Sequence, residues 1–212
     1  MKGLKAKKGI RLMVVDDHPA FRKGLAALIE SEPDLSVVAE TGDGRESIEL
    51  YRKVRPDVVL MDLRLPGFSG VEAIQAIRKE FPDARVIVVT TYDTDEDVYR
   101  ALQSGAKSYL LKDMFPEQIF DAIRAVYAGK SQLPPQVADR LDERLKRKEL
   151  TQREMDVLEL LVRGLSNKEI ADKLSLSEAA VKSRLKGLFH KLQVEDRAGA
   201  VISALHHGIV IL

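Results

Sequence analysis

Five short apolar runs, each followed by a segment with helical periodicity, occupy the first part of the chain. The expected strands cover residues 11–15, 36–40, 58–61, 86–90 and 108–111. The first, third and fourth runs are almost continuously apolar, which is typical of strands buried on both faces. The expected helices cover residues 19–31, 45–54, 71–80, 95–104 and 116–128. This alternation predicts an α/β domain with a doubly wound, flavodoxin-like sheet of five parallel strands.

Residues 148–212 follow a different pattern, in which every expected element is a helix. The stretches 151–154 (TQRE) and 166–169 (SNKE) are capping boxes that predict two helix starts, and these helices end near Val162 and Leu174. Ser177 is expected to cap a third helix whose apolar stripe is Val181, Leu185, Leu188 and Leu192. A fourth helix is expected from about residue 197 to 207. The tight link at 175–177 makes the second and third helices a helix-turn-helix.

The distribution of charge separates these two regions. Residues 10–128 hold 15 basic and 21 acidic side chains, whereas residues 129–212 hold 15 basic and 12 acidic ones. We therefore expect a basic tail at 1–9, an α/β domain at 10–128, a partly helical linker at 129–147 with an amphipathic helix over 136–148, and an all-α domain at 148–212. The chain has no cysteine, which excludes disulfides and thiolate metal sites. No apolar stretch approaches the ~18 residues that span a membrane, so a cytoplasmic protein without a membrane partner is expected.

Three carboxylates stand at the ends of two predicted core strands. Asp16 and Asp17 follow the first strand, and Asp62 follows the third. The carboxyl ends of parallel strands share one edge of a sheet, where ligands bind. Carboxylates that lie side by side are costly unless a cation neutralises them. We therefore predict a Mg²⁺ site made by Asp17, with help from Asp16, and by Asp62, which the backbone carbonyl of Arg64 completes.

Two further side chains are expected at the same edge, because Thr90 and Lys112 end or follow the fourth and fifth strands. Asp62 would attack phosphorus through a carboxylate oxygen, while Mg²⁺ and Lys112 neutralise the charge that spreads over the transferring oxygens. The Thr90 hydroxyl would bind the attached phosphoryl group, and Tyr109 would move between inward and outward positions. Each residue alone is more often a cap, loop or surface residue. Their joint placement on four strand ends favours a phosphoryl-accepting site.

Four motifs within residues 10–128 resemble those of a bacterial response-regulator receiver domain. They are VVDDH at 14–18, LMDLRLPG at 60–67, VTT at 89–91 and GAKSYLLKD at 105–113. The resemblance implies that Asp62 accepts a phosphoryl group from a phosphohistidine of a sensor histidine kinase. It also implies that Thr90 and Tyr109 couple phosphorylation to a surface change. One departure is Asp113, which follows Lys112 where many receivers have proline.

The third helix of the last region has a basic outward face. Such a face suits a helix that lies in the major groove of double-stranded DNA, but it is also found on ordinary solvent-exposed helices. Its surroundings resemble a LuxR-type four-helix DNA-binding domain through LTQRE at 150–154, GLSNKEIA at 164–171, VK at 181–182 and KL at 191–192. The whole chain thus resembles a NarL/FixJ-type response regulator. By that match the groove-facing residues are Lys182, Ser183 and Lys186, and the residues nearer the DNA backbone are Lys168 and Lys191.

The third helix departs from the family pattern at two positions. Ala180 stands where the family usually has threonine, which removes one phosphate contact, and Arg184 stands where histidine is frequent, which alters base preference. Gly187 lies within the helix, where it costs roughly 1 kcal/mol relative to alanine. We expect Gly187 to permit a close approach to a neighbouring backbone.

The combined prediction is a two-component response regulator, not an enzyme, in which phosphorylation of Asp62 controls sequence-specific DNA binding and homodimer formation. The fourth helix, with Val201, Ile202 and Leu205 and the apolar end 209–212, either forms the dimer contact or packs within its own domain. A phosphohydrolase reading would need a second aspartate two residues after Asp62, where Arg64 stands. A third reading makes the first domain a phosphorylation-independent interaction module. The presence of all three acids together with Thr90 and Lys112 argues against it.

Overall fold

The computed structural model describes residues 9–92, 94–131 and 133–210. The chain divides into two compact units, one made of residues up to 93 together with 98–138, and the other of 94–97 and 139–212. The predicted basic tail lies outside the described residues except for Gly9. Among the described residues, no helix combines the length and the apolar character needed to cross a bilayer.

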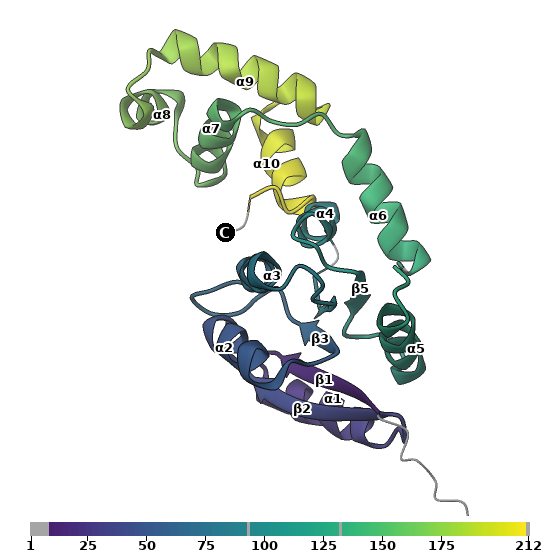
Figure 1. The fold of residues 1–212 in the computed structure, drawn as a ribbon. Helices are drawn as coiled ribbons and strands as arrows, with labels where there is room; N and C mark the ends of the chain where they lie inside the picture. Colours follow the sequence, from purple (N-terminus) through teal and green to yellow (C-terminus); the bar gives the residue numbers. More distant parts are fainter. Residues whose placement is uncertain (1–8, 93, 132, 211–212) are drawn as a thin grey trace, which may run out of the picture. The chain divides into compact units, whose positions relative to one another are not determined.

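A parallel five-stranded sheet forms the centre of the first unit (Figure 1). Its strands are β1 (Ile10–Val15), β2 (Leu35–Thr41), β3 (Val58–Met61), β4 (Val86–Thr90) and β5 (Ser108–Leu111), in the spatial order β2-β1-β3-β4-β5. This order confirms the predicted flavodoxin-like topology, in which the winding reverses between β1 and β3. The register pairs Val15 with Met61, so the residues that follow these two strands emerge next to each other.

Five helices accompany the sheet: α1 (Pro19–Glu30), α2 (Gly44–Val54), α3 (Gly70–Glu80), α4 (Asp95–Gln103) and α5 (Pro116–Tyr127). One face of the sheet is covered by α1 and α5, whose Ile29 and Ile123 join a core cluster with Val14 and Leu60. The helices α2 and α3 pack against each other. Pro19 and Pro116 occupy the first turns of α1 and α5, where a proline removes no helical hydrogen bond. Gly105 and Gly129 adopt φ of 103° and 82° just after α4 and α5, as expected for helix stops.

The second unit is helical. Its elements are α7 (Gln152–Val162), α8 (Asn167–Leu174), α9 (Glu178–Leu192) and α10 (Arg197–His206), and α6 (Pro135–Lys146) precedes them. Both predicted capping boxes form, with Thr151 and Glu154 opening α7 and with Ser166 and Glu169 opening α8. Ser177 caps α9, and its hydroxyl accepts a hydrogen bond from the N–H of Ala180. The expected apolar stripe of α9 is buried in one core cluster with residues of α7, α8 and α10.

The ends of the expected helices and strands agree with the structure to within two residues. Helix ends are set by caps that are visible in the sequence, and strand ends by the change from apolar to polar residues. Ile209 is buried in the helical core, so this part of the predicted apolar end packs within its own unit. Residues 211 and 212 lie outside the described part of the chain.

Candidate functional site

The acid cluster, defined as Asp16, Asp17 and Asp62, lies at the carboxyl ends of β1 and β3. Backbone hydrogen bonds continue beyond the strands and hold it there: the N–H of Asp62 donates to the carbonyl of Val15 at 2.8 Å, and the N–H of Asp16 donates to that of Thr41 at 3.0 Å. Asp16 and Asp62 are buried, with 2% and 3% of their surface exposed. The sheet therefore presents two carboxylates side by side in a poorly hydrated place.

Lys112 neutralises this pair in the structure. Its Nζ lies 2.6 Å from Oδ2 of Asp16 and 2.6 Å from Oδ2 of Asp62. Burial by itself disfavours the ammonium ion, but the hydrogen bonds to Asp16 and Asp62 outweigh it and raise the pKa of Lys112 above its usual value. The backbone N–H of Lys112 donates to the carbonyl of Thr90 at 2.9 Å, which aims the side chain from β5 towards the acid cluster. The predicted lysine and aspartates thus form one buried charge network.

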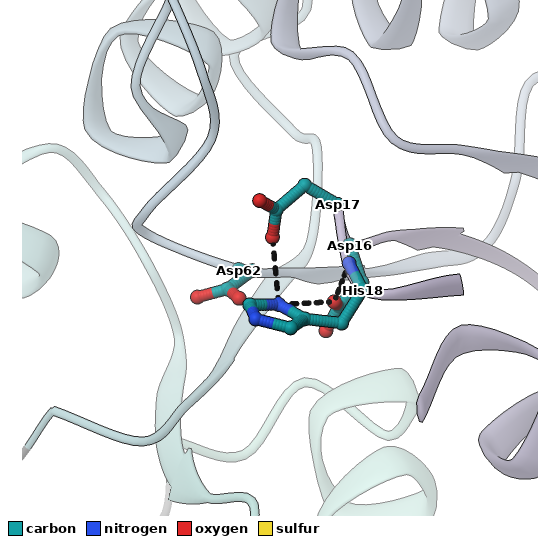
Figure 2. A group of neighbouring side chains, drawn as sticks. All are labelled: Asp16, Asp17, His18 and Asp62. Atoms are coloured by element: carbon teal, nitrogen blue, oxygen red, sulfur yellow. Dashed lines mark hydrogen bonds and ion pairs between the residues drawn. The ribbon is translucent and has the colours of Figure 1, made fainter. Parts of the chain in front are cut away.

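The third acid is arranged differently, as Figure 2 shows. Asp17 Oδ1 is buried and accepts no hydrogen bond from a described group, although His18 Nδ1 lies 2.8 Å away and pairs with it when the ring is protonated. Ligand atoms of Asp16, Asp17, His18 and Asp62 all lie within 4.8 Å of one another. Three carboxylates with one unsatisfied buried oxygen fit a hard divalent cation such as Mg²⁺, which prefers oxygen ligands. His18 was not predicted as part of this group; its place directly after the two aspartates is the only sequence signal.

Tyr92 links the two predicted switch residues, and sequence reasoning did not identify it. The N–H of Tyr92 donates to the Thr90 hydroxyl at 3.5 Å, while its carbonyl accepts a hydrogen bond from the Tyr109 hydroxyl at 2.7 Å. Thr90 and Tyr109 are fully buried, so Tyr109 occupies the inward position of the two that were predicted. A displacement of Thr90 would reach Tyr109 through this one residue. Its place directly after the motif VTT is a weak sequence signal, because it does not indicate where the loop after β4 runs.

The loop after Asp62 also has a defined geometry. The N–H of Arg64 donates to Asp62 Oδ1 at 3.3 Å, and the Arg64 guanidinium carbon lies 4.4 Å from the centre of the Tyr92 ring. Gly70 begins α3, and a Cβ atom built at this position would overlap with the carbonyl oxygen of Asp62. Glycine is therefore required where the helix start approaches the carboxylate-bearing residue. Sequence analysis did not identify Gly70.

The predicted basic face is present on α9. Lys182, Ser183 and Lys186 are exposed, Arg184 is partly buried, and Lys168 is exposed on α8. Among the described residues, no carboxylate lies in ion-pair distance of these four cationic side chains. The buried stripe of α9 fixes which face is turned outwards, because Val181, Leu185 and Leu188 face the core. This leaves Lys182 and Lys186 on the exposed side.

Lys191 differs from the other predicted residues of this face. Its Nζ lies 2.7 Å from Glu154 Oε2 and 3.1 Å from the carbonyl oxygen of Glu149. Glu154 is the acid of the α7 capping box, so Lys191 ties the end of α9 to the start of α7. The expectation for Gly187 is wrong. The nearest atom to a Cβ at this position is Glu154 Oε1 at 3.4 Å, a side-chain atom at ordinary contact distance. Among the described residues, no backbone atom of another segment lies within 4 Å of it.

Two family models match the chain. The response regulator receiver domain matches residues 12–124, and the model of bacterial regulatory proteins of the luxR family matches residues 148–204. The transcriptional regulatory protein LiaR of Bacillus subtilis (strain 168) is 38% identical over 209 residues, which cover 95% of this chain and 99% of the relative.

Two solved structures of RcsB resemble the chain over most of its length. RcsB from Salmonella enterica serovar Typhimurium, bound to a promoter in the presence of phosphomimetic BeF3−, has a TM-score of 0.73 at 27% identity and covers 94% of this chain and 99% of that one. A structure of two RcsB dimers bound to two parallel DNAs has a TM-score of 0.71 at 28% identity and covers 93% and 98%. The identities and the TM-scores together show a likeness in sequence as well as in fold.

Proposed function

This chain belongs to the two-component response regulators that join a receiver domain to a luxR-family DNA-binding domain, and from that membership we propose that Asp62 is the phosphoacceptor. The observation that carries the proposal is the position of Asp62 at the end of β3, with the Lys112 ammonium 2.6 Å from one of its oxygens. A nucleophilic carboxylate needs a neighbouring cation to receive a phosphoryl group without accumulating negative charge.

The phosphoryl donor in this proposal is a phosphohistidine on a sensor histidine kinase. A carboxylate oxygen of Asp62 attacks phosphorus, the phosphorus–nitrogen bond breaks, and its electron pair returns to the histidine of the kinase. Lys112 neutralises one of the phosphoryl oxygens, and the hydroxyl of Thr90 donates to another. The receiver acts as the acceptor in this transfer and not as an enzyme with its own substrate, apart from slow hydrolysis of its own acyl phosphate.

Mg²⁺ is the proposed cofactor, held by Asp16, Asp17, Asp62 and the backbone carbonyl of Arg64. The convergence of ligand atoms within 4.8 Å supports this assignment, and so does the buried Asp17 oxygen, which the exposed His18 ring approaches at 2.8 Å. When bound, the ion supplies positive charge to the transferring phosphoryl oxygens. Asp16 takes part through its hydrogen bond to the N–H of His18 at 2.8 Å, which orients its carboxylate.

The output proposed for the switch is sequence-specific binding of double-stranded DNA by α9, which controls transcription. The groove-facing residues are Lys182, Ser183, Arg184 and Lys186, and the residues nearer the DNA backbone are Lys168 and Lys191. The exposure of Lys182, Ser183 and Lys186 supports a contact with DNA, and among the described residues neither lysine has an ion-pair partner. Lys191 would have to leave Glu154 to reach a phosphate, so we rank its contact below that of Lys168. A protein with these partners acts in the cytoplasm.

A homodimer is the proposed DNA-binding form. The RcsB structures contain dimers on DNA, and a two-fold dimer reads two half-sites about one helical turn apart. On α10, Ile202 is 67% exposed and Leu205 is 38% exposed, which leaves an apolar surface for a second copy. We keep the predicted division into a receiver domain at 10–128, a linker at 129–147 and a DNA-binding domain at 148–212 as part of this proposal.

Phosphorylation of the full chain by a small phosphoryl donor with Mg²⁺ tests the acceptor. We expect one phosphoryl group per chain by intact mass, none in Asp62→Asn, and full incorporation in the control Asp121→Asn, whose exposed carboxylate lies on α5. Incorporation into Asp62→Asn would refute the assignment. DNA affinity that does not change with the donor or with beryllium fluoride would instead support a phosphorylation-independent receiver.

A salt titration tests the DNA face. Lys168→Gln should weaken binding to all sequences and reduce the slope of log affinity against log salt by about 0.9, because one phosphate contact is lost. The matched control is Lys53→Gln, an exposed lysine on α2 of the receiver. An equal change in both variants would show that only the overall charge of the protein matters.

A further inference from the structure

A basic hollow lies at the end of the sheet opposite the acid cluster. Its volume is about 450 Å³, and its lining includes the cations of Arg78, Arg85, Lys107 and Lys130. Each comes from a different segment: the last turn of α3, the residue before β4, the residue before β5 and the turn after α5. Four segments distant in sequence thus bring positive charge to one place, within a region in which acidic side chains outnumber basic ones.

These four cations have no carboxylate partner among the described residues. Elsewhere in the same unit several cations are paired with carboxylates, as Arg124 is with Asp34 at 2.8 Å and Arg52 with Glu80 at 2.8 Å. The one acidic residue of the hollow, Asp83, is exposed and forms no ion pair with any of the four. Like charges that converge without a counter-ion raise the free energy of the folded chain, and a bound anion removes that cost.

Part of the hollow is held rigidly. The Arg78 side chain crosses Gly105, where an added Cβ atom would overlap with its Nε and Cδ atoms. Arg78 then donates a hydrogen bond to the carbonyl of Ala84 at 2.9 Å. The guanidinium carbon of Arg85 lies 5.8 Å from the centre of the Tyr127 ring, within reach of a cation–π contact. Two guanidinium groups are therefore positioned before any ligand arrives, which lowers the entropy cost of binding.

Helix dipoles account for only half of this arrangement. The carboxyl ends of α3 and α5 attract cations, which explains Arg78 in the last turn of α3 and Lys130 just after α5. Arg85 and Lys107 stand before strands, where no helix end requires positive charge. Their presence beside the other two needs a different reason.

We propose that the basic hollow binds a small molecule carrying a diphosphate or triphosphate group. Guanidinium groups match phosphate oxygens in pairs, and two lysines add charge without a fixed geometry. A hollow of about 450 Å³ has the size of a small-ligand site. The proposal goes beyond phosphorylation and DNA binding, because none of the residues involved belongs to the acid cluster or to α9.

The test uses the full chain labelled with nitrogen-15, with EDTA present so that no divalent cation bridges phosphate to the acid cluster. Tripolyphosphate is titrated, with pyrophosphate and sulfate as ligands of lower charge. We expect saturable shifts of the backbone amides of Gly105, Lys107, Gly129 and Lys130, and affinity that falls from tripolyphosphate to sulfate. Lys107→Gln and Lys130→Gln should each weaken tripolyphosphate binding roughly fivefold to tenfold, since the site is partly screened by solvent.

The matched control is Lys79→Gln, which removes an exposed cation next to Arg78 that does not line the hollow. Its affinity should equal that of the parent chain. An equal weakening by Lys79→Gln and Lys107→Gln would mean that only net charge matters, and shifts confined to α9 would mean that polyphosphate binds there; either result overturns the proposal. Unchanged melting temperatures of the three variants exclude a folding defect as the cause of lost binding.

Discussion

The ammonium nitrogen of Lys112 lies 2.6 Å from Oδ2 of Asp62. The same nitrogen lies 2.6 Å from Asp16, so one lysine from the end of β5 neutralises two carboxylates from β1 and β3. Only 8% of the lysine side chain and 3% of each carboxylate side chain are exposed. Any group that binds to Asp62 must therefore fit around a charge network that the fold has already assembled.

Removal of this lysine should destabilise the receiver. Lys112→Gln leaves two buried carboxylates without their cation, which costs about 3–5 kcal/mol in the free energy of unfolding. Added Mg²⁺ should restore part of that loss, because the acid cluster regains a counter-ion. Urea denaturation with and without Mg²⁺ measures both effects. The control Lys79→Gln should change stability by less than about 0.5 kcal/mol. A loss that is identical with and without Mg²⁺ would contradict the proposed metal site.

Gly70→Ala should disturb Asp62 from a distance of eight positions in sequence. The new Cβ atom would overlap with the carbonyl oxygen of Asp62, so the loop or the start of α3 must shift. We expect a loss of about 1–3 kcal/mol in stability and slower phosphorylation. Gly24→Ala is the control: no atom lies within 4 Å of its added Cβ, and alanine suits the middle of α1. That variant should gain up to about 1 kcal/mol. Similar behaviour of the two variants would rule out the close contact as the cause.

Tyr109→Phe should separate phosphorylation from its consequence. The variant loses the hydrogen bond to the Tyr92 carbonyl, worth about 0.5–1.5 kcal/mol, but leaves the acid cluster intact. Asp62 should still accept phosphoryl groups, while the gain in DNA affinity on phosphorylation becomes smaller. Tyr51→Phe serves as the control, since that ring stacks on Phe81 at 4.9 Å and its hydroxyl makes no described hydrogen bond. The coupling through Tyr92 would be disproved by a DNA response as large as that of the parent chain.

Glu154→Gln should lower the folding stability of the DNA-binding domain. The loss should be larger at neutral than at acidic pH. Burial raises the pKa of Glu154, but hydrogen bonds from Lys191 and Thr151 outweigh it, so the native pKa lies below the usual 4.5. The stabilisation from a lowered carboxyl pKa is present above 4.5 and is lost as pH falls through the native value. We expect a loss of about 1–2 kcal/mol at pH 7 and a smaller one below pH 4, measured by thermal unfolding.

Glu169→Gln provides the comparison for this experiment. Glu169 is the acid of the α8 capping box and bonds Ser166 as Glu154 bonds Thr151, but it is exposed and has no lysine in hydrogen-bond contact. Its replacement should cost less than that of Glu154. Equal losses in the two variants would mean that the Lys191 ion pair adds nothing to the cap.

Much of the candidate site could be predicted because parallel strands bring their carboxyl ends to one edge. Asp16, Asp62 and Lys112 each follow an apolar run, and the structure joins these three in one network. Tyr92 and Gly70 could not be predicted in the same way. Their roles depend on the paths of the loops after β4 and β3, which carry no periodic signal.

The amino-acid sequence by itself determined the order, type and approximate ends of the helices and strands, because periodicity and caps act between residues close in the chain. It also determined which charged residues reach the sheet edge. Only the tertiary structure decided which of them pair: Lys191 with Glu154, and Lys112 with two aspartates at once. It also decided that Arg78, Arg85, Lys107 and Lys130 line one hollow in which none of them forms an ion pair with a described carboxylate. The physical reason is that ion pairing and burial depend on distances between segments far apart in sequence, which local patterns do not encode.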